Sequence, residues 1–333
     1  MLSVVAPIFN EQEVLPELYR RVIAVMEGTG LPFEFLLIND GSTDSSLEKM
    51  VQLAQADSRV KVLEFSRNFG HQAAILAGLT YACGDAVITL DGDLQHPPEL
   101  IPALIDKWRE GYEMVYTCRE GTENAGPLKD WSSRLFYGLM NRLCEVRVAS
   151  GAADFRLLDR RVVDVLCSLG EHALFMRGLV SWVGYRQIAL PYTVQPRYAG
   201  RSKYSFLKML GFAVNGISSF SSLPLYISTF IGLILSAASL AYGFYGIIMR
   251  LLSDRAVEGW ASVLVAVLFL GGILLITLGI QGIYLGHIYD EVKNRPRYLI
   301  RRTYGFQDTP PVEEASMSLP ALDSDWPSFR QGK

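Results

Sequence analysis

Cysteine is scarce in this sequence, and the net charge is slightly negative. The 333 residues contain only four cysteines, Cys83, Cys118, Cys144 and Cys167. None of them forms a Cys-x-x-Cys pair or a Cys/His pattern typical of a metal site, so we expect free thiols, as in a reducing compartment. The net charge is −3, and no stripe of Lys and Arg alternates with aromatic residues, so we expect no nucleic-acid binding.

Two long runs near the C-terminus almost lack charge. Half of the chain is hydrophobic, and its mean hydropathy is +0.21. Residues 225–252 carry no charge before Arg250, and residues 260–288 carry no Asp, Glu, Lys or Arg. Each run is long enough to cross a bilayer. Two buried core helices are the alternative, but runs this long and uncharged favour transmembrane helices.

The charges that flank these runs predict their orientation. Lys and Arg gather before the first run and after the second, whereas acidic residues offset Arg255 in the short loop between them. By the positive-inside rule, both outer ends face the cytoplasm. No signal-peptide pattern opens the sequence. We therefore expect a multi-pass protein of the plasma (inner) membrane, with its N-terminal part in the cytoplasm.

Short apolar runs alternate with helical patterns over the first 120 residues. This alternation predicts an α/β fold, with a parallel sheet covered by helices on both faces. We expect strands at residues 2–6, 33–38, 60–65, 85–90 and 114–117. We expect helices at about residues 14–26, 45–56, 71–81 and 100–109, then at 131–143, 161–169 and 174–183, with a strand at 185–190.

Polar loops follow four of these strands. They contain Asn10-Glu11, Asn39-Asp40, Arg67-Asn68 and Asp91-Gly92-Asp93. The carboxyl ends of parallel strands share one edge of a sheet, and ligands bind at that edge in such folds. We therefore expect the four loops to contribute to one site.

The segment Asp91-Gly92-Asp93 is the best candidate for a metal site. Side chains alternate along an extended backbone, so both carboxylates can face the same way. Hard oxygen ligands suit Mg²⁺ or Mn²⁺, and substrate phosphates can complete the shell of either ion. A single Asp-x-Asp after a strand is more often ordinary turn chemistry, so the metal interpretation depends on the neighbouring motifs.

Four motifs, taken in order along the chain, resemble glycosyltransferase family 2. They are Pro7-Ile8-Phe9-Asn10-Glu11, Asn39-Asp40-Gly41-Ser42-Thr43-Asp44, Ser66-Arg67-Asn68-Phe69-Gly70-His71-Gln72-Ala73-Ala74 and Asp91-Gly92-Asp93-Leu94-Gln95-His96-Pro97. Together with the two C-terminal runs, residues 1–305 are similar to polyprenyl-phosphate glycosyltransferases of the GtrB-like and dolichol-phosphate-mannose-synthase type. Asn39 departs from the family pattern, which usually has Asp there, so a charge at that position is not essential.

The resemblance implies a fold class and a reaction. The fold would be α/β: a GT-A (Rossmann-like) nucleotide-sugar domain, then an amphipathic juxtamembrane helix and two transmembrane helices. The domains would be a cytoplasmic catalytic domain (1–205), an interfacial helix (206–222), the two membrane helices (223–290) and a partly disordered cytoplasmic tail (291–333). The reaction would move a sugar from a nucleotide sugar to a polyprenyl (undecaprenyl) phosphate, with metal-assisted inverting chemistry.

The resemblance also implies roles for individual residues. The residues expected to hold Mg²⁺ or Mn²⁺ are Asp91, Asp93 and Gln95. Those expected to bind the nucleotide sugar are Pro7, Phe9, Glu11, Asp40, Arg67 and Asp91, with Arg197, Ser202 and Lys203 from a basic loop. Those expected to grip the acceptor phosphate are Arg119, Ser133 and Arg134. Catalytic roles would fall to Asp93 and Asp154.

The chemistry limits what Asp154 has to do. A phosphate monoester is already largely ionised near neutral pH, so it needs no strong base before it attacks the sugar. We therefore expect Asp154 to orient the sugar or the acceptor and not to abstract a proton; a capping acid is the alternative. We expect structural roles for His71 and His96, because the reaction requires neither.

Other functions fit parts of the sequence. A processive family 2 synthase would carry more membrane spans and a Gln/Arg-rich-Trp motif, and this sequence has neither. A nucleotide-sugar-binding module that serves as a membrane scaffold is the second alternative, and the intact Asp91, Asp93 and Arg119 argue against it. UDP-glucose is the favoured donor, because residues 66–78 and the two spans look GtrB-like; GDP-mannose and a UDP-amino sugar remain alternatives.

Small residues in the second run bear on assembly. Such residues allow close packing of membrane helices, either within one chain or between the chains of a homo-oligomer. They are Gly271, Gly272, Gly279 and Gly282.

Overall fold

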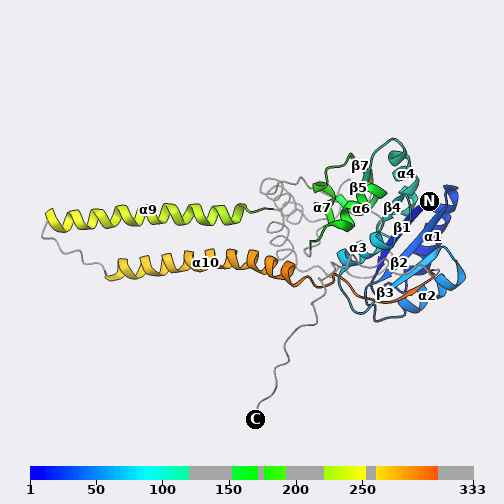
Figure 1. The fold of residues 1–333 in the computed structure, drawn as a ribbon, viewed down its shortest axis with the longest axis horizontal. Coiled ribbons are helices and arrows are strands. Elements are labelled where there is room, and N and C mark those ends of the chain that lie inside the picture. The colour runs from blue at the N-terminus through cyan, green and yellow to red at the C-terminus, as the bar shows by residue number, and fades with distance from the viewer. Residues whose placement is uncertain (120–151, 172–175, 193–220, 253–259, 307–333) are drawn as a thin grey trace, which may run out of the picture.

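A mixed β-sheet forms the centre of the globular part of the molecule (Figure 1). The computed structural model describes residues 1–119, 152–171, 176–192, 221–252 and 260–306. Within them, eight strands follow the order β7-β5-β6-β4-β1-β2-β3-β8. The strands are β1 (Leu2–Ile8), β2 (Phe33–Asn39), β3 (Val60–Phe65), β4 (Ala86–Thr89), β5 (Met114–Arg119), β6 (Ala152–Asp159), β7 (Gln187–Tyr192) and β8 (Ile300–Tyr304).

Helices cover both faces of the sheet, as the alternation of strands and helices predicts. The helices of the globular part are α1 (Leu15–Gly28), α2 (Ser46–Ala56), α3 (His71–Tyr81), the short 3₁₀ helix η1 (Pro98–Leu100), α4 (Ile101–Arg109), α6 (Arg160–Ser168) and α7 (Met176–Trp182). The expected boundaries lie within a few residues of these. The segment expected as a helix at 131–143 lies outside the described residues.

The direction of two strands differs from the expected parallel sheet. The four strands β1 to β4 are parallel, as expected. The strand β6, however, runs antiparallel to both β4 and β5, and β8 runs antiparallel to β3. The segment 152–159 gave no strand signal because Asp154 and Arg156 interrupt its apolar pattern, although both side chains are buried in the fold.

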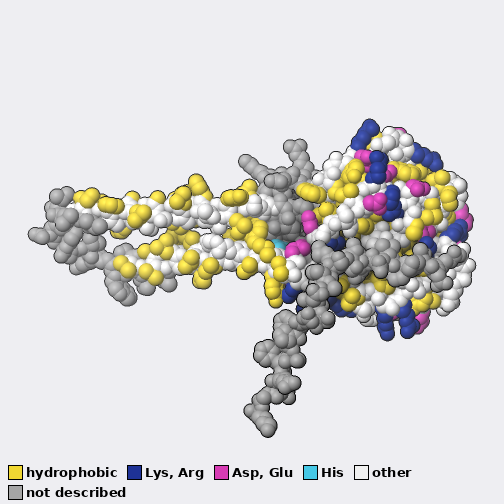
Figure 2. Space-filling view, viewed as in Figure 1, with side chains coloured by type: hydrophobic (Ala, Val, Ile, Leu, Met, Phe, Trp, Pro, Cys, Tyr) yellow, Lys and Arg dark blue, Asp and Glu magenta, His cyan; other side chains and the backbone are white. Residues whose placement is uncertain are grey.

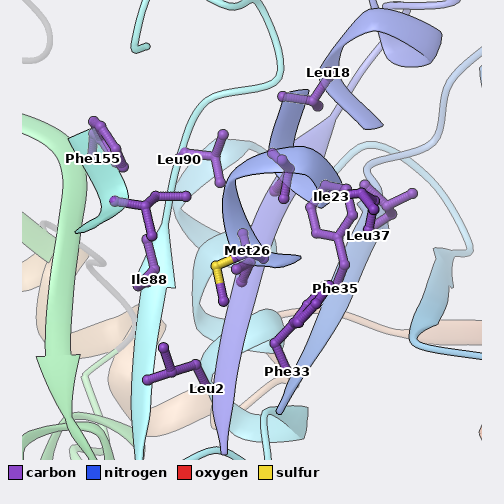
Figure 3. Packing of buried hydrophobic residues seen from close by; sticks show 14 of the residues in the cluster. Leu2, Leu18, Ile23, Met26, Phe33, Phe35, Leu37, Ile88, Leu90 and Phe155 are labelled. Atoms are coloured by element: carbon purple, nitrogen blue, oxygen red, sulfur yellow. The ribbon is translucent and has the colours of Figure 1, made fainter. Parts of the chain in front are cut away.

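Two apolar layers hold the sheet between its helices. On one face, α1 packs Leu18, Ile23 and Met26 over the side chains of β1, β2 and β4 (Figure 3). On the other face, α3 packs together with α6 and α7. The helix α3 lies very close to the sheet, since a Cβ atom on Gly78 would come within 2.1 Å of Val5 Cγ1. The small side chains of α3 therefore fix where its N-terminal end lies.

Two long helices extend away from the globular part (Figure 1). They are α9 (Leu223–Leu252) and α10 (Trp260–Lys293), and each is long and apolar enough to cross a membrane. Their apolar side chains face outward along most of their length (Figure 2), and at most 6% of either apolar window is buried. This exposure disagrees with the alternative of two buried core helices. The expected interfacial helix at 206–222 falls almost wholly outside the described residues.

The chain returns to the sheet after α10. The strand β8 pairs with β3 at the edge of the sheet, with Thr303 opposite Leu63. The sequence did not predict this strand, because Arg301 and Arg302 lie within it and it offers no continuous apolar run. As a result, both ends of the described chain contribute strands to one sheet.

Candidate active site at the carboxyl edge of the sheet

Antiparallel β6 brings Asp154 beside Asp91 at the carboxyl edge of β1, β2 and β4. Thr89, the last residue of β4, pairs with Arg156 of β6. The start of β6 therefore lies next to the end of β4, and Thr89 donates from Oγ1 to the carbonyl oxygen of Asp154 (2.6 Å). The polar loops after β1, β2, β3 and β4 do share one edge, as expected for parallel strands.

The loop after β4 is pressed against the end of β1. A Cβ atom on Gly92 would lie 3.0 Å from the carbonyl oxygen of Pro7 and closer still to a side chain of β1, so this position requires glycine. Asp93 accepts a hydrogen bond at Oδ1 from the backbone amide of Gln95 (3.1 Å). Asp91 Oδ1 is buried and has no hydrogen-bond partner in the described part of the chain. A buried oxygen without a hydrogen bond is unfavourable, and a bound cation would supply the missing contact.

Two histidines flank Asp91. His71 begins α3, and its Nε2 lies 3.3 Å from Asp91 Oδ1 and 3.8 Å from Asp154 Oδ2. His96 is buried, with Nδ1 3.2 Å from Asp91 Oδ2 and its ring stacked near Phe155. Loss of water contact opposes the protonation of His71, but the carboxylates of Asp154 and Asp91 outweigh it and raise the pKa of His71. Both imidazoles thus lie at the site, which the sequence alone did not indicate.

Two arginines hold Asp154. Its carboxylate is buried and accepts at Oδ1 from Arg156 Nη2 (2.9 Å) and Arg177 Nε (3.0 Å), and at Oδ2 from Arg177 Nη2 (2.9 Å). Burial alone would raise the pKa of Asp154, but the guanidinium of Arg177, then His71 and Arg156, hold it well below its usual range. A carboxylate held in this way stays ionised at neutral pH and is a poor proton acceptor. The orienting role expected for Asp154 stays a prediction.

The donor chemistry of Asp91 and Asp93 fits a divalent cation. Both residues offer carboxylate oxygens from one tight loop, and Asp91 Oδ1 lacks a hydrogen bond. In the ranges that the structure describes, no three His, Cys, Asp or Glu side chains form a metal-binding group. Mg²⁺ in proteins usually takes only one or two carboxylates and completes its shell with water and substrate phosphates, so a pair such as Asp91 and Asp93 has suitable donor chemistry. A role for the side chain of Gln95 stays a prediction.

The loops after β1, β2 and β3 form the other part of this edge. Phe9 is 40% exposed, so its ring is accessible to a ligand. Asp40 is buried, which raises its pKa, and its carboxylate accepts from the backbone amides of Phe69 (2.7 Å) and Gly70 (3.1 Å). Arg67 stacks its guanidinium over the Phe69 ring, with Cζ 4.2 Å from the centroid. Asp40 therefore shapes the loop that presents Arg67, and its contact with a nucleoside stays a prediction.

The other expected residues divide into two groups. Pro7 and Glu11 lie at or just beyond the end of β1, and Arg119 ends β5, whose register against β6 directs it to the same edge. Five expected residues lie outside the described part of the chain. These are Ser133 and Arg134, expected at the acceptor phosphate, and Arg197, Ser202 and Lys203, expected at the donor phosphates.

Two arginines of the site did not emerge from the sequence. Burying a charged side chain is costly unless a group of opposite charge lies beside it. In the run Asp154-Phe155-Arg156, the sequence therefore did contain an indication that Arg156 pairs with Asp154. No local pattern indicated Arg177. It comes from α7, 23 residues after Asp154, and only the packing of that helix brings the two together.

The sequence is similar to those of known glycosyltransferases. Residues 3–167 match the family model "Glycosyl transferase family 2". The chain is 42% identical over 309 residues to the uncharacterized glycosyltransferase sll0501 of Synechocystis sp., covering 93% of this chain and 97% of that protein. It is 43% identical over 303 residues to the bactoprenol glucosyl transferase of Shigella phage SfII, covering 91% of this chain and 98% of the relative.

Among solved structures, one similar protein is glucosyl-3-phosphoglycerate synthase from Mycobacterium tuberculosis, in complex with Mn²⁺, UDP-glucose and phosphoglyceric acid. It is 18% identical to this chain, and the match covers 66% of this chain and 77% of that one with a TM-score of 0.44.

Proposed function

Because the chain belongs to glycosyltransferase family 2, we propose that it transfers glucose from UDP-glucose to a polyprenyl phosphate at the cytoplasmic face of the plasma membrane. One observation carries the proposal: the likeness to a bactoprenol glucosyl transferase runs through 91% of this chain and so includes both the acidic edge and the two apolar helices. The family's chemistry is inverting, so the acceptor attacks the sugar from the face opposite the departing diphosphate.

The acidic loop after β4 would receive the donor diphosphate. When bound, Mg²⁺ or Mn²⁺ would neutralise the negative charge that grows on the diphosphate as it leaves. Asp91 and Asp93 would hold the ion, with Gln95 beside them. His71 and His96 lie against Asp91 and limit the directions in which its carboxylate can turn.

Asp154 would orient the substrates without taking a proton. The attacking group is an ionised phosphate oxygen, so the bond to the sugar carbon forms while the bond to the diphosphate breaks, and no proton has to move. The guanidinium groups of Arg156 and Arg177 keep Asp154 charged and fixed. Its remaining acceptor capacity would serve a sugar hydroxyl, which requires a carboxylate at a constant position.

Cationic and polar side chains would hold the two substrates, whose negatively charged phosphate groups repel each other. The acceptor phosphate would be bound by Arg119, Ser133 and Arg134. The donor phosphates would be bound by Arg197, Ser202 and Lys203. Guanidinium groups are well suited to this because they donate paired hydrogen bonds to phosphate oxygens. The apolar helices α9 and α10 would keep the enzyme at the bilayer, where the lipid acceptor is confined. Such tethering raises the effective concentration of the acceptor.

A transfer assay tests this proposal. Purified full-length protein in detergent would be incubated with Mg²⁺, undecaprenyl phosphate and, in separate tubes, radiolabelled UDP-glucose, GDP-mannose and UDP-N-acetylglucosamine. We expect label to move into the organic phase from UDP-glucose and not after Asp93→Ala. Transfer from another donor would replace the proposed sugar. Binding of a nucleotide sugar without transfer would favour the binding-module alternative.

A further inference from the structure

The chain that leaves α10 returns to the globular part through one short segment, residues 294–306, here called the return segment. Asn294 turns the chain in a left-handed conformation (φ +43°) directly after α10. Arg297 then donates from Nη2 to the carbonyl oxygen of Leu169, just beyond α6. The strand β8 follows and pairs with β3, so the return segment joins a membrane helix directly to the sheet edge (Figure 1).

The return segment contacts the beginning of the loop after β3. Tyr298 stacks on Phe65, the last residue of β3, with ring centroids 5.3 Å apart and ring planes within 9° of parallel. The carbonyl oxygen of Leu299 accepts a hydrogen bond from the backbone amide of Ser66 (2.9 Å). The first residue of the loop is therefore held by a part of the chain more than 200 residues away.

These contacts continue through the loop to Arg67. Phe65 meets Phe69 edge-to-face, with centroids 5.7 Å apart. Arg67 in turn stacks over the Phe69 ring. Tyr298, Phe65 and Phe69 thus form an aromatic row that ends beneath an exposed guanidinium at the proposed donor side of the site.

The loop from residue 66 to residue 70 is held from two sides. Asp40 of the loop after β2 binds the backbone amides of Phe69 and Gly70. The return segment supports Phe65 and Ser66 from the opposite end. Asp40 directly follows the central strand β2, whereas the return segment is attached to α10. The position of the loop therefore depends partly on the chain emerging from the membrane helix.

We propose that Tyr298 is a positioning residue for donor binding: through Phe65 and Phe69 it sets the place of Arg67, and it makes donor affinity depend on the segment that leaves α10. This inference rests on the proposed function, since it takes the ligand of Arg67 to be a nucleotide sugar. Tyr298 itself need not touch the donor. One aromatic pair is expected to change donor affinity by about 3- to 10-fold.

The test compares substitutions at Tyr298 in the full-length protein in detergent. Tyr298→Ala removes the ring, Tyr298→Leu keeps apolar volume without an aromatic face, and Tyr298→Phe keeps the ring. Arg302→Ala is the matched control, because it alters an exposed side chain of the same segment. Each variant would be measured for UDP binding by calorimetry with Mn²⁺, for donor KM, acceptor KM and kcat, and for melting temperature.

We expect Tyr298→Ala and Tyr298→Leu to raise the Kd for UDP and the donor KM by about 3- to 10-fold, with kcat and acceptor KM unchanged. Tyr298→Phe should lose much less than Tyr298→Ala, because it keeps the stacked ring, and Arg302→Ala should match the wild type. Unchanged UDP binding in Tyr298→Ala and Tyr298→Leu would overturn the inference. Equal losses in donor KM, acceptor KM and kcat, together with a lower melting temperature, would also overturn it, since they indicate a purely structural role.

The wild-type measurements separate this inference from the proposed function. If the wild type binds UDP but transfers no glucose, the proposed reaction fails while the comparison among Tyr298 variants still decides the inference. If the wild type binds neither UDP nor GDP, both fail together.

Discussion

Asp91, in the loop after β4, and Asp154, on the neighbouring strand β6, lie at one edge of the sheet, but the surroundings of their carboxylates differ. Asp91 has a buried oxygen with no hydrogen bond in the described structure, and the imidazoles of His71 and His96 lie beside its carboxylate. Asp154 accepts three hydrogen bonds from two guanidinium groups. The difference teaches that one carboxylate is kept available for a ligand, whereas the other is fixed by the protein itself.

The largest expected effect follows from removing the available charge. Asp91→Asn should lower kcat by roughly a thousandfold, because metal-assisted charge stabilisation is worth several kcal/mol and each ~1.4 kcal/mol is tenfold in rate. The melting temperature should fall little, because asparagine keeps the shape of the side chain and only its contacts with His71 and His96 change. Steady-state transfer rates and Mn²⁺ binding in the presence of UDP would check this. A variant that kept about a tenth of the wild-type rate would contradict a metal role.

Removing an arginine that binds Asp154 should mainly lower the stability of the fold. Arg156→Met leaves Asp154 buried with one guanidinium fewer, so we expect a loss of about 3 kcal/mol in the free energy of unfolding, as for other broken buried pairs. Thermal unfolding in detergent would measure it. Arg161→Met is the control, because Arg161 lies on the exposed surface nearby, and it should change little. Equal melting temperatures for Arg156→Met and Arg161→Met would show that the buried network does not stabilise the fold.

The pH dependence of stability tests whether Asp154 stays ionised in the folded protein. The pKa of Asp154 in the folded protein lies well below its usual value, so its charge stabilises the fold at any pH above the unfolded pKa of about 3.9. This contribution is lost only as the pH falls below that value. The difference in melting temperature between wild type and Asp154→Asn should therefore persist down to about pH 5 and shrink below about pH 4. Because Asp154 also raises the pKa of His71, the difference should grow, and not shrink, as the pH falls through the neutral range. A difference that shrank already near pH 6 would mean that Asp154 titrates in the neutral range.

The smallest expected effect concerns the group between the two carboxylates. His71 places Nε2 within reach of both Asp91 and Asp154. His71→Ala should weaken Mn²⁺ binding in the presence of UDP by about 2- to 10-fold, which is the worth of one ordinary hydrogen bond. His71→Gln should lose less, because its amide nitrogen can reach the same position. If both variants bound Mn²⁺ as the wild type does, His71 would have no part in orienting Asp91.

Much of the fold followed from local patterns. The strands β1 to β4 are short, largely apolar runs that are buried almost throughout, and the helices α1 and α2 have apolar residues at helical spacing. Their places and the shared carboxyl edge of the strands were therefore predictable. The direction of β6 was not, because Asp154 and Arg156 look like loop residues until their partner is known. The return of the chain to β3 was not predictable either, since β8 carries arginines and depends on a neighbour about 240 residues away.

The sequence by itself determined the α/β alternation, the acidic loop of Asp91 and Asp93 and the two apolar helices, because each is encoded within a few neighbouring residues. Only the tertiary structure decided that Asp154 lies beside Asp91, that Arg177 holds it, and that Tyr298 supports the loop of Arg67. These are contacts between distant segments, and strand direction and helix packing set them. Local chemistry therefore specified which groups the site contains, and long-range packing specified how each group is held.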